Sequence, residues 1–303
     1  MERNFPNKLS QRVWVLGNHF FHTYLVKGEG CALIEAGIAT SADQVIQQTA
    51  VLGIEPEQVA YLVIMHAHFD HVTGVPRLKK AFPNMQVVAS PYAARLLGKP
   101  HVVAGFYEEE RPMVENLAAI GLPRPTAMDL SIVSGIGVDR IVEDGAVLNL
   151  GGICKLKVYA APGHSPCSIA VMLEEDQILF PTDCAGYPLS MEYTWPVFFY
   201  SYQSYLDNLK KLITLKARVL AGPHELVVIG EQAVEEHLKQ ALAETIKLRD
   251  FIVAEFQSGK SAEIISDQLF HRVYINGIAH LGEPTIRGCA DLLVRRSLET
   301  MGS

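Results

Sequence analysis

Four side chains that bind metals well lie within six residues of one another: His66, His68, Asp70 and His71. They follow residues 61–65, an apolar run without charge that is typical of a strand buried on both faces. Imidazole and carboxylate groups at this spacing are suitable ligands for zinc, iron or manganese. A loop that is rich in histidine by chance is the alternative, but it accounts poorly for three histidines and an aspartate at this spacing. We therefore predict a metal site.

Three further metal-binding side chains each follow a later apolar run. They are His164 after residues 156–160, Asp183 after 178–180, and His224 after 218–221. Taken singly, each would be an ordinary surface, core or turn residue. Folds built of sheets and helices gather their sites at the carboxyl ends of strands, so the four strand ends together favour one shared metal site.

The remaining patterns up to about residue 230 predict alternating strands and helices that would position these ligands. Further strands are expected at 13–16, 22–26, 31–35, 86–89, 141–142, 146–148 and 169–172. Helices are expected over about 40–52, 76–81, 91–97 and 203–214. Residues 98–138 show no strand pattern, and we expect short helices and loop there, with a lid over the site as one use.

The hydrophobic period changes after residue 230. One face of a long amphipathic helix is predicted by Val234, Leu238, Ala241, Thr245, Leu248 and Ile252, which recur at steps of three and four. Ser261 can cap a second helix and Pro284 can begin a third. We therefore expect a metal-binding domain over 1–230 and a helical appendage over 231–303 that packs on it.

The composition is that of an ordinary globular protein, with 49% apolar and 19% charged residues in a chain of 303. The net charge of −7 gives no electrostatic footprint for nucleic acid or anionic membrane. No stretch has the length of a membrane span, and the first residues lack a secretory signal. Five scattered cysteines without a CxxC motif indicate free thiols in a reducing compartment. We expect a soluble cytoplasmic protein with neither nucleic acid nor membrane as a partner.

With these motifs in this order, the sequence resembles the metallo-β-lactamase superfamily. The resemblance covers about residues 12–230 and is carried by His66-x-His68-x-Asp70-His71, Gly163-His164-Ser165, Asp183 and His224. The opening hairpin through Ile34-Glu35-Ala36-Gly37 adds support. The resemblance implies an α/β (α+β) fold of the αββα type, with two sheets face to face, helices outside, and two divalent metal ions in the cleft between the sheets.

The same resemblance implies how the ligands are shared. His66, His68 and His164 would hold one metal ion, Asp70, His71 and His224 the second, and Asp183 both. A hydroxide between the ions would attack an electrophilic carbonyl, and Asp70 would deliver a proton to the leaving group. Tyr187 lies near the position where some lactone hydrolases of the superfamily keep a tyrosine. The ligand types leave zinc, iron and manganese open.

Two positions depart from the family pattern. Glu35 stands where relatives often have aspartate, and Thr182 stands where they often have glycine before the bridging aspartate. Both side chains should contact ligands and not the metals, so they would tune affinity and orientation. Cys184 follows Asp183, and in an extended segment its side chain would face away from its neighbour, so we interpret it as a core thiol.

Residues 187–205 contain eight aromatic side chains and leave directly from Asp183. Aromatic walls near the metals favour an apolar or aromatic acyl group as substrate. The alternative, with equal weight, is that these rings support the helical appendage or a homodimer contact. The layout resembles glyoxalase II and the bacterial quinolone-signal response thioesterase, but the basic stretch by which glyoxalase II binds glutathione is not found in 231–303. We expect a hydrolase of a small-molecule thioester, ester or lactone.

Other functions stay open at this point. An iron-dependent redox enzyme of the same fold, such as a persulfide dioxygenase, would share the ligand motif. A signalling or binding protein with incidental hydrolase activity would use the appendage and the aromatic segment as a partner surface. A phosphodiesterase or nuclease is less favoured, because the chain is acidic and the segment after Asp183 is aromatic.

Overall fold

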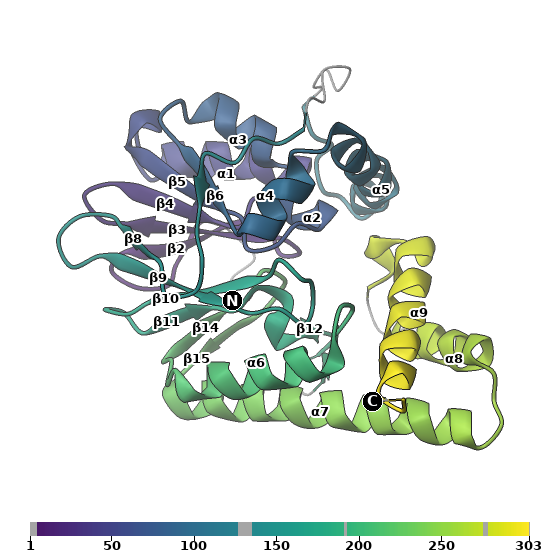
Figure 1. Cartoon of the computed structure of the whole chain (residues 1–303). Coiled ribbons are helices and arrows are strands. Elements are labelled where there is room, and N and C mark those ends of the chain that lie inside the picture. Colours follow the sequence, from purple (N-terminus) through teal and green to yellow (C-terminus); the bar gives the residue numbers. More distant parts are fainter. Residues whose placement is uncertain (1–4, 127–134, 191–192, 275–277, 303) are drawn as a thin grey trace.

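Two mixed sheets lie face to face in this computed structural model, which describes residues 5–126, 135–190, 193–274 and 278–302 (Figure 1). One sheet has seven strands in the order β1-β2-β3-β4-β5-β6-β7, and the other has six in the order β15-β14-β11-β10-β9-β8. Helices cover the outer faces of both sheets (Figure 1). The predicted αββα sandwich is confirmed.

The seven-stranded sheet begins antiparallel and becomes parallel from β4 onward. Its strands are β1 (Asn7–Lys8), β2 (Val13–Gly17), β3 (His22–Lys27), β4 (Cys31–Ile34), β5 (Val59–Val63), β6 (Gln86–Ala89) and β7 (Arg140–Ile141). Leu62 and Ile64 face the outer helices, whereas Val63 and Met65 face the opposite sheet. The segment that leads to the first ligands is therefore buried on both faces, as its unbroken apolar run predicts.

The six-stranded sheet is antiparallel except where β11 pairs with β14. Its strands are β8 (Val147–Asn149), β9 (Lys155–Ala160), β10 (Ile169–Leu173), β11 (Ile178–Phe180), β14 (Val219–Ala221) and β15 (Val227–Ile229). A separate hairpin is formed by β12 (Tyr187–Pro188) and β13 (Thr194–Trp195). The strand β15 and this hairpin were not predicted.

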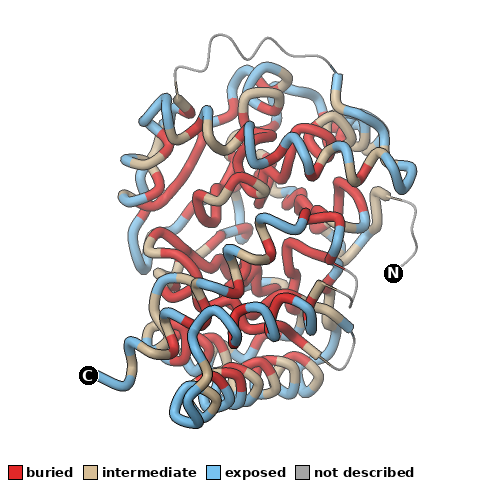
Figure 2. Tube along the Cα trace, turned by 90° about the vertical axis from the view of Figure 1, so that its right-hand side faces the viewer, coloured by how far each residue is buried: buried red, intermediate tan, exposed pale blue. Residues whose placement is uncertain are grey.

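The core between the sheets is built by alternate residues of the central strands, among them Tyr24, Ile34, Val158, Val171 and Phe180. Figure 2 shows buried chain running through the interior, with exposed chain confined to the outside. The helices α1 (Ala39–Val51), α3 (Val75–Ala81) and α4 (Pro91–Leu97) cover the seven-stranded sheet, and α6 (Tyr202–Thr214) and α7 (Glu231–Gln257) cover the other (Figure 1). Since the helices cover the outer faces of the sheets and side chains fill the space between them, the predicted ligands lie in loops that follow the strands.

The chain after residue 230 forms α7, α8 (Ala262–Tyr274), the short helix η4 (Ala279–Leu281) and α9 (Glu283–Glu299). The fully buried positions of α7 are the predicted stripe: Val234, Leu238, Ala241, Thr245, Leu248 and Ile252. Ser261 Oγ accepts a hydrogen bond from the Ile264 amide at 3.3 Å, and Pro284 lies in the first turn of α9, both as predicted. These helices share one buried cluster with α5, α6 and the 178–198 region. The domain boundary at residue 230 stays a prediction.

The prediction of short helices and loop over 98–138 was wrong for its first half. Residues Pro100–Ala119 form α5, a single helix of 20 residues that runs through Pro112. Its buried positions include Val103, Met113 and Leu117, and the spacing was obscured by the charged run between them. Residues 127–134 lie outside the described chain, and the lid stays a prediction. No helix in the described ranges is both long and apolar enough to cross a membrane.

Candidate metal centre

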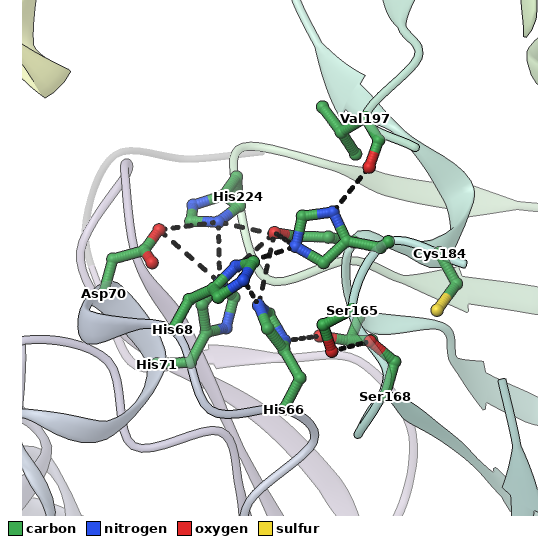
Figure 3. A network of polar contacts seen from close by, with 12 residues as sticks. His66, His68, Asp70, His71, Ser165, Ser168, Cys184, Val197 and His224 are labelled. Carbon is green, nitrogen blue, oxygen red and sulfur yellow. Dashed lines mark hydrogen bonds and ion pairs between the residues drawn. The ribbon is translucent and has the colours of Figure 1, made fainter. Parts of the chain in front are cut away.

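The first ligand motif leaves the end of β5 in an extended conformation. Helix α2 (Phe69–Val72) starts only after His68, which has φ −100° and ψ 156°. His66 and His68 therefore precede the helix, and Asp70 and His71 lie in its first turn (Figure 3). The helix is followed by Gly74, where an added Cβ would lie 2.3 Å from the Ala36 carbonyl oxygen. Only glycine allows the chain to pass so close to the preceding loop.

Three imidazoles converge at one point of the centre (Figure 3). His68 Nδ1 lies 3.1 Å from His66 Nε2 and 2.9 Å from His164 Nε2. A tetrahedral zinc ion with Zn–N bonds of about 2.0–2.1 Å would separate its ligand nitrogens by about 3.3 Å. The spacing of these nitrogens therefore fits a shared cation.

A second group of ligand atoms lies beside the first. Asp70 Oδ2 is 3.5 Å from His71 Nε2 and 3.6 Å from His224 Nε2, and these two nitrogens are 3.3 Å apart. Two imidazole nitrogens and one carboxylate oxygen therefore face a common point. This donor set suits the same divalent metals as the first group.

Asp183 lies between the two groups. Its Oδ2 is 3.3 Å from His164 Nε2 and 3.4 Å from His71 Nε2, and its Oδ1 is 3.5 Å from His224 Nε2. Asp183 Oδ1 is buried and has no hydrogen-bond partner among the described residues. An unpaired buried carboxylate oxygen is costly, and cations between the two groups would remove that cost. The structure thus brings all seven predicted ligands together, while their individual roles as ligands stay predictions.

The outward-facing nitrogens of the histidines are held by hydrogen bonds. Nδ1 of His164 donates to the Val197 carbonyl oxygen at 2.7 Å, and Nδ1 of His224 donates to the Phe20 carbonyl oxygen at 3.0 Å. A proton on Nδ1 leaves the Nε2 lone pair directed at the centre. The protein therefore presents these imidazoles in the tautomer that binds a metal.

Glu35 and Thr182 hold two more histidines in the same way. His71 Nδ1 donates to Glu35 Oε2 at 2.9 Å, and His66 Nδ1 lies 3.0 Å from Thr182 Oγ1, which itself donates to Glu35 Oε1 at 2.8 Å. Glu35 contacts His71 directly, and Thr182 contacts His66, whereas the prediction that neither side chain binds a metal itself stays a prediction. Thr182 has φ 49°, in the left-handed region that favours glycine, so this backbone position is strained for a threonine.

Burial and charge set the protonation of the centre. Burial lowers the pKa of His66 and His164, and it lowers that of His68 to about 3, so these imidazoles are neutral, as metal binding requires. Burial would also lower the pKa of His71, but Glu35, Asp70 and Asp183 together outweigh it and raise that pKa well above its usual value. Without metal, a cationic His71 therefore balances the buried carboxylates. Metal binding would replace that proton.

Cys184 is a core thiol, as predicted, although its segment is the short helix η3 (Thr182–Ala185) and not a strand. Its Sγ donates to the Ala161 carbonyl oxygen at 3.1 Å, and burial raises its pKa. A thiol held in this way does not serve as a ligand here.

Tyr187 lies beside the second group of ligands. Its ring centroid is 4.9 Å from that of His224, and its Oη is 3.4 Å from Nε2 of His280. Burial raises the pKa of Tyr187 well above 10, so the phenol keeps its proton and can donate it in a hydrogen bond.

A pocket of about 640 Å³ opens above the centre. Its floor is formed by ligands, and its walls come from three other parts of the chain. The walls are Tyr187, Trp195, Val197 and Phe199 near the sheets, Phe106, Glu109 and Met113 of α5, and Leu281, Pro284, Thr285, Gly288, Cys289, Asp291 and Leu292 of η4 and α9. No lysine or arginine is among the described residues that line it.

The aromatic segment 187–205 serves both predicted roles. Tyr187, Trp195 and Phe199 line the pocket, whereas Phe198 and Tyr205 are buried in the cluster that supports the C-terminal helices. The pocket wall in α9 was not predicted, and for α5 the sequence suggested only that residues 98–138 could lie over the site, without naming the residues that line it. They lie far from the ligand motifs in the sequence, and nothing in their residue types distinguishes them from ordinary helix faces.

The αββα sandwich and the cluster of histidines and aspartates at its loop end together indicate the class of protein to which the chain belongs. The chain matches the family model of the metallo-β-lactamase superfamily over residues 20–224, and it belongs to that superfamily. Members bind divalent metals and are usually hydrolases. The predicted family is confirmed.

Similar proteins cover the chain to different extents. A metallo-β-lactamase fold-containing protein of Sulfurisphaera tokodaii is 27% identical over 253 residues, which cover 81% of this chain and 86% of that protein. A hydroxyacylglutathione hydrolase of Rhodopseudomonas palustris is 28% identical over 134 residues, 44% of this chain and 37% of its own length. A metallo-β-lactamase family protein of Thermus thermophilus matches the fold with a TM-score of 0.68 at 18% identity, covering 97% of this chain and 95% of that one.

Proposed function

We propose that this protein is a dinuclear metal-dependent hydrolase of thioesters, esters or lactones that carry an apolar acyl group. The observation that carries the proposal is the pair of ligand groups joined by Asp183 at the floor of an apolar pocket. Superfamily membership supports hydrolysis, and the pocket walls support the choice of acyl group.

The two metal ions would be held by the groups already described, with His66, His68 and His164 around one, Asp70, His71 and His224 around the other, and Asp183 between them. When bound, the ions supply Lewis acidity, which lowers the pKa of water and polarises the acyl carbonyl.

Asp70 is suited to move the proton of the reaction. In the metal-free protein, burial would raise the pKa of Asp70, but the cationic His71 outweighs it and holds that pKa at about 2. A bound metal cation would take the place of that positive charge and keep the carboxylate ionised. It can accept the proton that an attacking water loses as the new C–O bond forms. It can then give the proton to the thiolate or alkoxide as the C–S or C–O bond to the leaving group breaks. Tyr187 would donate a hydrogen bond to the acyl oxygen as negative charge develops there.

The pocket supports an apolar substrate without negative charges. Phe106, Met113 and Leu292 offer apolar surface, and Glu109 adds a carboxylate to the lining. Because the described lining contains no cationic side chain, carboxylates of a glutathione conjugate would be unpaired there. For this reason we do not propose hydroxyacylglutathione hydrolysis, the activity in the name of the Rhodopseudomonas palustris relative.

Protein loaded with zinc, manganese or iron and assayed on a panel of acyl thioesters, esters and lactones tests the proposal. We expect hydrolysis that increases with the apolar length of the acyl group, and complete loss with a chelator. Fully loaded protein that hydrolyses no member of the panel would contradict it.

Iron-dependent oxidation of a persulfide is the second candidate, because the imidazole and carboxylate donors also suit iron. Oxygen uptake on adding a persulfide to the iron-loaded protein, without thioester or lactone hydrolysis, would favour this candidate instead.

A further inference from the structure

We propose that His280 is a positioning residue that holds the Tyr187 hydroxyl toward the acyl oxygen. The inference rests on the proposed hydrolase function. The inference adds to that function a role for the C-terminal part of the chain, because His280 follows the last predicted ligand, His224, by more than 50 positions.

The first observation is the contact itself. His280 Nε2 lies 3.4 Å from Tyr187 Oη, and the imidazole is 7% exposed. Tyr187 lines the pocket and its ring lies against that of the ligand His224. His280 therefore contacts a residue that lines the pocket and packs against a predicted ligand.

The second observation is that the position of His280 is fixed independently of Tyr187. Its ring centroid lies 4.5 Å from that of Phe20, whose carbonyl oxygen accepts from His224 Nδ1. Asn116 of α5 donates to the His280 carbonyl oxygen at 3.4 Å. The imidazole packs against Phe20 and the backbone of His280 is held by α5, so the residue can fix a neighbour.

The proposed role of Tyr187 requires that His280 donates the hydrogen bond between them and Tyr187 accepts it. A phenol that donates its proton to His280 would have none to offer to a substrate. With the proton of His280 on Nε2, this nitrogen donates to Tyr187 Oη, and the hydroxyl proton of the tyrosine is free to point into the pocket. The role of His280 is to select this orientation of the hydroxyl.

The variants His280→Phe, His280→Gln and Tyr187→Phe separate this role from packing. Phenylalanine keeps the ring contact with Phe20 but has no nitrogen, whereas glutamine restores a donor. We expect kcat to fall about 100-fold in Tyr187→Phe, in line with the loss of one donor to the developing oxyanion. In His280→Phe we expect kcat to fall about 10-fold, with KM and metal content unchanged, as for other supporting hydrogen bonds.

The double variant and the glutamine variant decide how His280 acts. If it acts through the hydroxyl, His280→Phe has no further effect in the Tyr187→Phe background, and His280→Gln recovers most of the lost kcat. The exposed His271 changed to Phe is the matched control and should equal wild type. Wild-type kcat in His280→Phe, or independent effects that multiply in the double variant, would overturn the proposal.

A second readout does not depend on turnover. In metal-free protein labelled with ¹⁵N-histidine, we expect the His280 Nε2 resonance to show a protonated nitrogen and to shift in Tyr187→Phe. An unprotonated Nε2, or a resonance that does not move, would overturn the proposal. If no substrate is hydrolysed, the proposed function is wrong. The NMR measurement still decides whether His280 donates a hydrogen bond to Tyr187.

Discussion

The metal centre and the pocket wall above it are built in different ways. Every predicted ligand lies on a loop that follows a strand of the sandwich or in the first turn after it, and hydrogen bonds from Glu35, Thr182 and backbone carbonyls fix the imidazoles. The facing wall comes from α5 and α9, which approach the centre from the outside (Figure 1). The side chains of α5 and α9 that line the pocket are mostly apolar, with Glu109, Thr285 and Asp291 as the polar ones.

Because of this difference, we expect the metal centre to determine the rate of the reaction and the pocket wall to determine which substrate binds. The loops at strand ends are held on both sides by buried sheets, so they can keep ligand atoms at fixed distances. Helices that pack on the outside can change sequence without moving the ligands. Changes at the centre should therefore affect metal binding and kcat, whereas changes at the wall should affect which acyl group binds.

The largest effect is expected for Asp183→Asn. An amide in place of the carboxylate removes a negative charge from between the two groups of ligands, so at least one metal ion per chain should be lost. We expect kcat/KM to fall about 1,000-fold or more, as for other loss of metal-dependent catalysis. Metal analysis and the hydrolysis assay measure both. Asp207→Asn, an exposed change on α6, is the control and should leave metal content and rate as in wild type.

Glu35→Gln should have an intermediate effect. The carboxamide of the variant has one acceptor oxygen, so it can accept from either His71 or Thr182 but less well from both. It also lacks the negative charge that Glu35 contributes beside the predicted ligands. We expect metal affinity to weaken about 10- to 100-fold, with kcat largely recovered at saturating metal. Competition with a chromogenic chelator measures the affinity. An affinity equal to wild type would mean that Glu35 does not orient the ligands.

Gly288→Leu tests the wall. An added Cβ at Gly288 of α9 meets no atom within 4 Å, and the residue lines the pocket, so the new side chain would occupy space used by the substrate. We expect KM for a long acyl chain to rise about 10-fold while that for an acetyl ester and the metal content stay constant. Gly105→Leu on α5 is the matched control, because its Cβ also meets no atom but does not line the pocket. Equal effects of the two changes would contradict the position of the wall.

The smallest effect on activity is expected for Ile252→Ala in α7. The side chain is fully buried, so its truncation should lower the free energy of unfolding by about 3 kcal/mol. Metal affinity should not change, since Ile252 is not among the described residues that line the pocket or bond to the predicted ligands. Phe251→Ala, at a neighbouring position that is 38% exposed, should cost much less. Thermal unfolding and metal titration of both variants measure stability and metal affinity. A loss of metal affinity in Ile252→Ala would contradict the claim that the C-terminal helices and the metal centre act independently.

Local patterns predict most of the strands, most of the helices and a shared metal site, whereas the αββα sandwich was predicted from the resemblance to the metallo-β-lactamase superfamily. The apolar run before His66 has the length of one buried strand, and the stripe from Val234 to Ile252 repeats with the period of a helix. The seven ligands have distinctive chemistry and follow strands, so their convergence could be predicted from the order of the motifs.

The pocket wall could not be predicted in the same way. Met113 and Leu292 are ordinary apolar residues of helices, and only the tertiary packing of those helices decides that they face the metals. His280 gave no signal, because a lone histidine is more often a surface or core residue than part of a site. The helix α5 was missed because the charged run 108–111 and Pro112 interrupt its apolar positions.

Metal titration of the metal-free wild-type protein tests the central claim most directly. If seven side chains enclose a pair of ions joined by Asp183, about two equivalents of zinc should bind per chain, with release of the proton held by His71. A single equivalent, or binding that survives unchanged in Asp183→Asn, would contradict the account.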